Sequence, residues 1–205
     1  MPKMRYFSLW IAIVTVVIFI LQYIFQNFND LFILKQSAPF EIWRYVTAIF
    51  LHGSLPHLLF NLFALVMFGF ILEKKIGTNK FLLVFFVSGI FANIVAVNFY
   101  PASLGMSGAI FGIIGAQVVI NPMMGVFAFG MVVPMFIAAI IWAVVDIVGL
   151  FMADNTGHIA HLSGIIIGLA FGIFFRVNHE TNKRRHTIEI PEHVLRKWET
   201  LYIGG

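Results

Sequence analysis

The apolar residues of this chain gather in six long segments that are separated by short polar breaks. A helix needs about 20 predominantly apolar residues to cross a hydrocarbon core of about 30 Å, and each segment is near that length. We therefore predict an all-α membrane protein, a bundle of six transmembrane helices. The predicted helices cover residues 7–26, 57–72, 81–98, 107–120, 126–151 and 158–175.

The same pattern divides the chain into three regions. Residues 1–6 form a short N-terminus, residues 7–176 the helical domain, and residues 177–205 a polar C-terminal tail. No small-residue cleavage site follows the first apolar segment, so we predict a retained anchor. Residues 27–56 are predicted to form a structured outer loop at the membrane interface, which Trp43 and Tyr45 favour. A solvated tail is predicted, with an amphipathic surface helix over 191–201 as the alternative.

Composition supports a membrane protein and excludes several other classes. The chain is 60% hydrophobic and 11% charged, whereas soluble domains are about 45–50% apolar and about 25% charged. Cysteine is absent, which excludes disulfides and a thiol nucleophile. The net charge of +4 does not indicate nucleic-acid binding, because the basic residues flank the apolar segments.

The distribution of lysine and arginine predicts the orientation. With six spans both termini lie on one side, and cytoplasmic loops carry the excess of basic residues. The outer side holds only Lys35 and Arg44. We therefore predict that both termini are cytoplasmic, on the side that holds Lys3, Arg5, Lys74, Lys75, Lys80, Arg176, Lys183, Arg184, Arg185, Arg196 and Lys197.

Strongly polar residues within spans are costly and usually functional. Four of them are predicted at one depth: His57 and Asn61 begin the second helix, Ser107 opens the fourth, and His161 lies in the first turn of the sixth. At about 1.5 Å per residue, all four lie within roughly 10 Å of the outer ends of their helices. The other polar residues within the spans are Asn93, Asp146 and His158.

Small residues follow two of these positions at helical spacing. Gly108 and Gly112 follow Ser107, and Gly164 and Gly168 follow His161. Such faces let two helices approach backbone to backbone, which would bring the serine near a histidine base. A serine nucleophile needs such a base.

Acyl transfer also needs donors for the oxyanion. His57 and Asn61 are four residues apart and therefore share a helix face. The amide of Asn61, the ring N–H of His57 and the backbone N–H of Ser107 are the candidates. Together these residues predict an acyl-transfer site with a nucleophile, a base and oxyanion donors.

These residues resemble the motifs of the rhomboid family of intramembrane serine proteases. They appear in the family's order: Trp43-Arg44, then His52-Gly-Ser-Leu-Pro-His57-Leu-Leu-Phe-Asn61, then Gly105-Met-Ser107-Gly108, then Ala160-His161-Leu-Ser-Gly164-Ile-Ile-Ile-Gly168. The absence of a seventh helix matches the six-helix bacterial form, which implies a bacterial inner (plasma) membrane protein with its active site toward the outer side.

The resemblance implies a role for each matched residue. Ser107 would be the nucleophile and His161 the base of a dyad without an acidic third member. His57 and Asn61 would bind the oxyanion, and Phe111 matches an aromatic position that packs on the catalytic histidine. The implied partners are transmembrane protein substrates within the bilayer; no cofactor, metal or nucleic acid is implied.

The other polar residues of the spans and His52 have roles of their own in this prediction. His158 competes with His161 as the base, although the glycine spacing favours His161. Asp146 is predicted to make a structural or gating hydrogen bond rather than to complete a triad. His52 is predicted to anchor a loop, and Asn93 to bond between helices.

Other classes of protein are less well supported. A metal or proton transporter would more often show midplane carboxylates and repeated halves. A zinc metalloprotease would need His-Glu-x-x-His, which is absent. An inactive rhomboid relative serving as a chaperone or quality-control factor would usually have lost Ser107 or His161.

Overall fold

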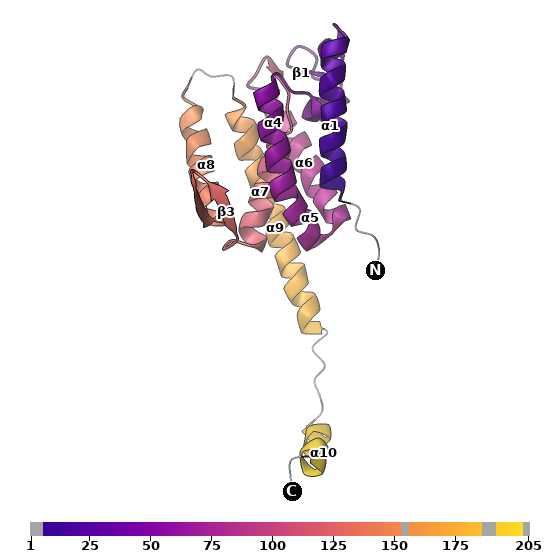
Figure 1. Ribbon diagram of the computed structural model, residues 1–205, viewed down its shortest axis with the longest axis vertical. Coiled ribbons are helices and arrows are strands. Elements are labelled where there is room, and N and C mark those ends of the chain that lie inside the picture. The colour runs from indigo at the N-terminus through magenta and orange to yellow at the C-terminus, as the bar shows by residue number, and fades with distance from the viewer. Residues whose placement is uncertain (1–5, 153–155, 186–191, 203–205) are drawn as a thin grey trace. The chain divides into compact units, whose positions relative to one another are not determined.

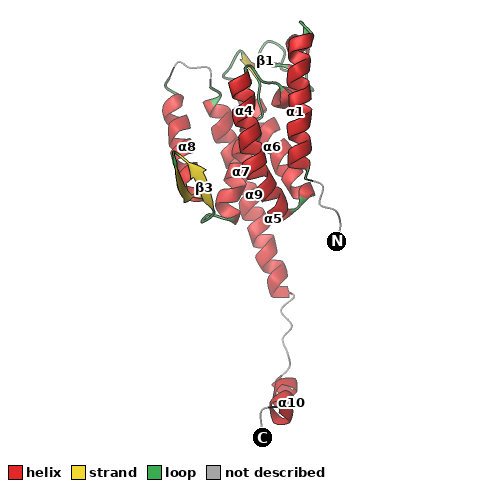
Figure 2. Cartoon of the chain, in the orientation of Figure 1, coloured by secondary structure: helices red, strands yellow, loops and turns green. Residues whose placement is uncertain are grey.

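A computed structural model describes residues 6–152, 156–185 and 192–202 of the chain, and most of them are helical (Figures 1 and 2). Residues 1–5 of the predicted N-terminus and parts of the predicted tail lie outside the described residues. The chain divides into two compact units, Met1–Ile173 and Phe174–Gly205. The first unit holds the candidate site.

Each predicted apolar segment contains a helix, in the predicted order. The fourth begins and ends where predicted, and the second continues through a π-helical turn, η2 (Leu65–Gly69), into α5. The helices are α1 (Phe7–Ile24), α4 (Leu55–Ala64) with α5 (Phe70–Ile76), α6 (Thr78–Ala96), α7 (Ser107–Ile120), α8 (Met135–Gly149) and α9 (His158–Arg185).

Four of these segments are long and apolar enough to span a membrane: Phe7–Ile24, Leu55–Ile76, Thr78–Ala96 and His158–Arg176. The two shorter ones, α7 and α8, have 14 and 15 residues. At about 1.5 Å per residue, each is roughly 21–23 Å long, less than the hydrocarbon core. The helical membrane fold is therefore as predicted, while the count of six complete spans stays a prediction.

The predicted fifth helix, residues 126–151, is wrong over its first part. β3 (Gly125–Ala128) and β4 (Met131–Pro134) form an antiparallel hairpin there, and the helix begins only at Met135. The two turn residues, Phe129 and Gly130, both have positive φ, at 55° and 79°. Two such residues are typical of tight hairpin turns. Hydropathy alone does not distinguish an apolar strand from an apolar helix.

Two features of the C-terminal region also differ from the prediction. α9 continues to Arg185 rather than ending at residue 175, and α10 (Glu192–Tyr202) is helical. Whether the tail is solvated stays a prediction, and its end forms the helix of the predicted alternative. Its strongly amphipathic character is that of a surface helix, although its contact with a membrane stays a prediction.

The outer loop is structured by short elements that hold the segment before Ser107. They are α2 (Phe28–Phe32), β1 (Leu34–Lys35), α3 (Arg44–Thr47) and the 3₁₀ turn η1 (Ala48–Phe50). β1 pairs with β2 (Ala102–Ser103), four residues before Ser107. Asn93 Nδ2 on α6 donates to the Tyr45 carbonyl, 2.8 Å away, and so connects a spanning helix to this loop.

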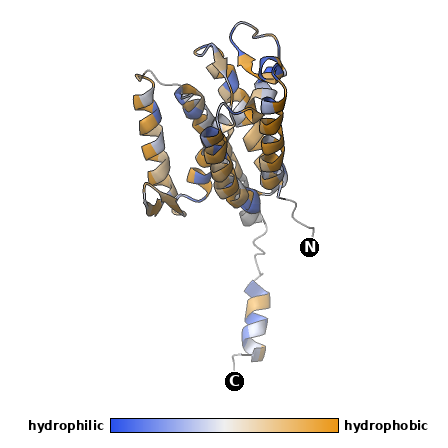
Figure 3. Ribbon diagram, turned by 45° about the horizontal axis from the view of Figure 1, so that its top comes forward, coloured by the Kyte–Doolittle hydropathy of each residue, from blue (hydrophilic) through white to orange (hydrophobic). Residues whose placement is uncertain are grey.

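A buried carboxylate accepts hydrogen bonds from the first backbone N–H groups of α1. The Glu73 carboxylate is fully buried and accepts from the backbone N–H groups of Phe7 and Ser8, at 2.8 and 2.9 Å. A carboxylate at this position complements the positive end of α1. By contrast, most residues of the helices in the first unit are hydrophobic (Figure 3), and many of their large apolar side chains are exposed, as lipid contact requires.

Candidate active site

Ser107 is the first residue of α7, directly after a sharp bend in the chain. Gly105 has φ +113°, a conformation that glycine adopts readily, and its N–H donates to the Ala48 carbonyl at 2.9 Å. The serine side chain is partly exposed and lines a cavity of about 1060 Å³. The backbone N–H groups at the start of α7 have no partner within their helix, as at any helix N-terminus.

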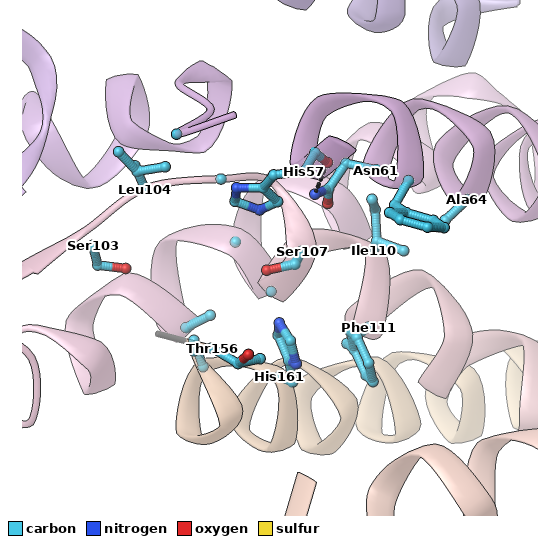
Figure 4. Close-up of a pocket in the computed structure, with 18 of the residues that line it drawn as sticks. His57, Asn61, Ala64, Ser103, Leu104, Ser107, Ile110, Phe111, Thr156 and His161 are labelled. Carbon is cyan, nitrogen blue, oxygen red and sulfur yellow. Dashed lines mark hydrogen bonds between the residues drawn. The ribbon is translucent and has the colours of Figure 1, made fainter. Parts of the chain in front are cut away.

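His161 lies in the first turn of α9 and is buried. Its ring stacks flat on Phe111, one turn after Ser107, with centroids 4.3 Å apart and an interplanar angle of 4°. Figure 4 shows the Ser107 side chain and a ring nitrogen of His161 directed toward one another across the cavity. The structure thus brings these two residues together from positions 54 apart in the sequence.

Glycines allow this approach of α7 and α9. A Cβ added at Gly164 would collide with the carbonyl of Gly108, and one added at Gly168 would collide with the carbonyl of Gly112. The two backbones are therefore in direct contact along successive turns, the arrangement that small residues permit between membrane helices.

His57 and Asn61 lie on α4 and line the same cavity (Figure 4). A Cβ at Gly105 would lie 2.8 Å from His57 Cε1, so the glycine leaves room for the imidazole. Asn61 Nδ2 donates to the His57 carbonyl, 2.8 Å away. Because an amide nitrogen carries two hydrogens, one N–H of Asn61 remains for another acceptor.

Trp43 and Arg44 do not line this cavity. Arg44 is buried and its Nη1 donates to the carbonyls of Asp30 and Ile33, at 2.7 and 2.8 Å, while its Nε pairs with Glu41. Trp43 Nε1 donates to the Leu31 carbonyl. Both residues therefore hold the outer loop together rather than contribute to the chemistry.

His52 lies behind His57, outside the spanning helices. Its backbone N–H and carbonyl bond to the Gln22 side chain of α1, at 3.0 and 3.1 Å, which fits the predicted loop anchor. Its ring lies edge-on to that of His57, with centroids 5.0 Å apart. Burial, together with the neighbouring His57, lowers the pKa of His52 to about 4.

Asp146 on α8 contacts both His161 and His158, and the sequence did not predict these partners. Its Oδ1 lies 2.9 Å from His161 Nδ1 and 2.7 Å from His158 Nδ1. Among the described residues, these three side chains also form a group whose ligand atoms are close enough to hold a metal ion. The sequence signal was depth alone, since Asp146 lies in the outer half of its segment.

Comparison with known proteins agrees with this geometry. Residues 39–178, more than half of the chain, match the Rhomboid domain family. The chain belongs to the rhomboid family. A Rhomboid protease GlpG from Salmonella choleraesuis (strain SC-B67) is 33% identical over 146 residues, covering 68% of this chain and 50% of that protein. A Rhomboid protease GlpG from Salmonella newport (strain SL254) is 32% identical over the same shares.

The family assignment confirms the predicted resemblance and an integral membrane protein. This rhomboid spans about half the length of the curated relatives that it matches. The matched residues 39–178 contain Ser107, His161, His57 and Asn61. The cavity of the rhomboid domain therefore holds a candidate nucleophile, a candidate base and several N–H donors.

Proposed function

We propose that this rhomboid is an intramembrane serine endopeptidase that cleaves transmembrane segments of other membrane proteins with a Ser107–His161 pair. One observation carries the proposal: the Ser107 side chain and a ring nitrogen of His161 face each other across one cavity (Figure 4). A serine hydroxyl becomes an effective nucleophile when a neighbouring base takes its proton.

The reaction follows from these two groups. His161 accepts the hydroxyl proton while Ser107 Oγ bonds to the carbonyl carbon of the substrate. The tetrahedral oxyanion then collapses, the peptide C–N bond breaks, and His161 gives its proton to the departing amine. Water, deprotonated by the same histidine, hydrolyses the acyl-serine ester and returns the serine hydroxyl. No cofactor or metal enters this sequence.

The developing oxyanion has three donors in the proposal. The backbone N–H of Ser107 is at the N-terminus of α7, where donors and the helix dipole favour negative charge. The second N–H of Asn61 and a ring N–H of His57 come from α4. Donors fixed in place before the reaction are the largest single source of rate enhancement in acyl transfer.

The short length of α7 supports a water-filled site below the membrane surface. Its 14 residues span roughly 21 Å of a core of about 30 Å. A helix that ends at the inner face therefore places Ser107, its first residue, roughly 9 Å below the outer one. A substrate helix must unwind to present a carbonyl there, because helical backbone groups are bonded internally.

The proposed setting is a bacterial inner membrane, with both termini cytoplasmic and the cavity toward the outer side. The basic residues support this orientation, eleven against two in the predicted topology. The proposed partners are transmembrane substrates that carry small or helix-breaking residues near the cleaved bond.

A serine-reactive fluorophosphonate probe tests the proposal on the purified full chain in detergent. Wild-type protein should be labelled, and Ser107→Ala should not. Ser163→Ala is the matched control, because this serine of α9 donates its hydroxyl to the carbonyls of Ile159 and Ala160. Labelling that persists in Ser107→Ala, or that is absent from wild type, would defeat the serine protease assignment.

A further inference from the structure

We infer that Asp146 is a positioning residue for this site: its carboxylate orients His161 and is shared with His158. This inference rests on the proposed function and adds a carboxylate to a pair that the family resemblance treats as complete. Asp146 is buried, with 4% of its surface exposed. Its Oδ1 lies within hydrogen-bond distance of both histidine rings, at 2.9 Å from His161 and 2.7 Å from His158.

The bond to His161 selects one tautomer of the ring. An ionised carboxylate has acceptors only, so the Nδ1 atom that faces it must carry the proton. In the neutral ring the lone pair then lies on Nε2. A general base for Ser107 needs that lone pair on the side of the ring away from Asp146. The ring nitrogen that faces Ser107 in Figure 4 is then an acceptor before substrate arrives.

Two contacts at right angles fix the ring. Phe111 stacks on its face, with planes 4° apart, and so limits tilting. Asp146 holds its edge through Nδ1 and so limits rotation in the plane of the ring. When His161 takes the serine proton, the buried Asp146 carboxylate is also the nearest negative charge to the imidazolium.

One oxygen of the Asp146 carboxylate, Oδ1, is shared between His158 and His161. His158 and His161 are three residues apart on α9 and therefore lie on one face. Both rings bring Nδ1 to the same carboxylate oxygen, whereas Asp146 Oδ2 is buried and has no hydrogen-bond partner among the described residues. His158 also packs directly against Gly149 of α8. The bond from His158 thus connects α9 to α8, and the separate bond from His161 to the same carboxylate positions the base.

A purely structural role would look similar in the coordinates, because Asp146 also connects α8 to α9 through His158. Two variants separate the roles. Asp146→Asn keeps the shape but removes the charge, so both bonds change. His158→Asn removes one link between the helices but leaves the carboxylate available to His161.

Cleavage of a model transmembrane substrate by the full chain in liposomes gives kcat and KM for each variant. Asp146→Asn should lower kcat on the order of 10²-fold with KM within about twofold. The same replacement of a triad aspartate by asparagine costs roughly 10⁴-fold in a serine protease, and a smaller loss is expected here because the stack on Phe111 also holds the His161 ring. His158→Asn should keep more than about half of wild-type kcat. Equal losses in both variants, or full activity in Asp146→Asn, would contradict the inference.

A second measurement needs no catalytic activity. In protein with ¹⁵N-labelled histidine, NMR shifts of His161, assigned with His161→Gln, report which ring nitrogen carries the proton. Wild type and Ser107→Ala should both show the Nδ1–H form, and Asp146→Asn should show a mixture. An Nε2–H form in wild type would overturn the inference while leaving the serine assignment intact. If Ser107→Ala still cleaves substrate, the proposed function fails instead.

A metal ion would use the same three ligands, and a chelator distinguishes the two cases. EDTA should leave the wild-type kcat unchanged. A kcat that falls with EDTA and recovers with Zn²⁺ would show that the cluster holds a metal, and would contradict the hydrogen-bonded arrangement.

Discussion

At the residue scale, the positions of the candidate catalytic side chains depend on neighbouring residues that do not react. Phe111 lies flat on His161, and Gly105 leaves room for the His57 ring. A misplacement of about 1 Å in a catalytic group can cost roughly 10²-fold in rate. The contacts of these uncharged residues therefore help to determine the relative positions of the side chains in the site.

Asn61 tests the proposed oxyanion site. Removing one oxyanion donor typically costs about 10²–10³ in kcat, so Asn61→Ala should lose activity on that order without becoming inactive, because backbone N–H groups remain. The measurement is kcat for a model transmembrane substrate.

Asn98→Ala is a matched control for this variant. Asn98 Nδ2 donates to the Ile94 carbonyl at 2.8 Å, the same bond over four residues that Asn61 makes, but Asn98 does not line the cavity. Asn98→Ala should keep full turnover. If both variants lose the same activity, the effect of Asn61 is structural.

His52 predicts a dependence of stability on pH. The folded protein holds its pKa at about 4, below the unfolded value of about 6.5. The unfolded state therefore binds more protons between these values. The contribution of His52 to the free energy of unfolding is complete above about pH 6.5 and is lost progressively as the pH falls to about 4. The Tm of wild type should fall more over this window than the Tm of His52→Gln, and parallel curves would contradict the assignment.

The sequence predicted which residues meet better than it predicted how they bond. Depth along a helix follows from hydropathy and a rise of about 1.5 Å per residue, so Ser107, His161, His57 and Asn61 were expected together, and they line one cavity. The bond from Asp146 to His161 depends on the rotation of α8 against α9. The hydropathy pattern of either segment alone does not predict how the two helices are rotated against each other.

At the element scale, the contact between α7 and α9 determines the site. Both helices present glycines at every turn of the interface, and their backbones touch there. The spacing of these glycines predicted the contact, because few other faces of an apolar helix allow such an approach. The hairpin at 125–134 was missed for the opposite reason, since its apolar strands look like part of a span.

Gly168→Leu tests this contact. Its side chain would meet the Gly112 carbonyl and force α9 away from α7. We expect at least about a tenfold loss of kcat and a lower Tm. Ile166→Leu, on the exposed face of the same helix, is the control and should change neither. Full activity and an unchanged Tm in Gly168→Leu would mean that the helices do not pack in this way.

At the scale of the whole molecule, the fold places a cavity that gathers a few polar side chains within an apolar helical domain. The helices that surround the cavity expose apolar side chains outward, whereas the cavity gathers His57, Asn61, Ser107 and His161. Composition and hydropathy predicted the membrane class and the order of the helices. The short α7 was predicted at its observed bounds, 107–120, whereas the short α8 was not, because the strands before it are as apolar as the helix.

The most direct test of the account is whether Ser107 and His161 act as one catalytic unit. Cleavage of a model transmembrane substrate is compared for wild type, Ser107→Ala, His161→Ala and the double variant. When a nucleophile and its base work together, removing either disables nearly the same step, so the effects are far from additive. The account predicts that all three variants are about equally inactive. Cleavage that persists in Ser107→Ala, or losses that multiply in the double variant, would contradict it.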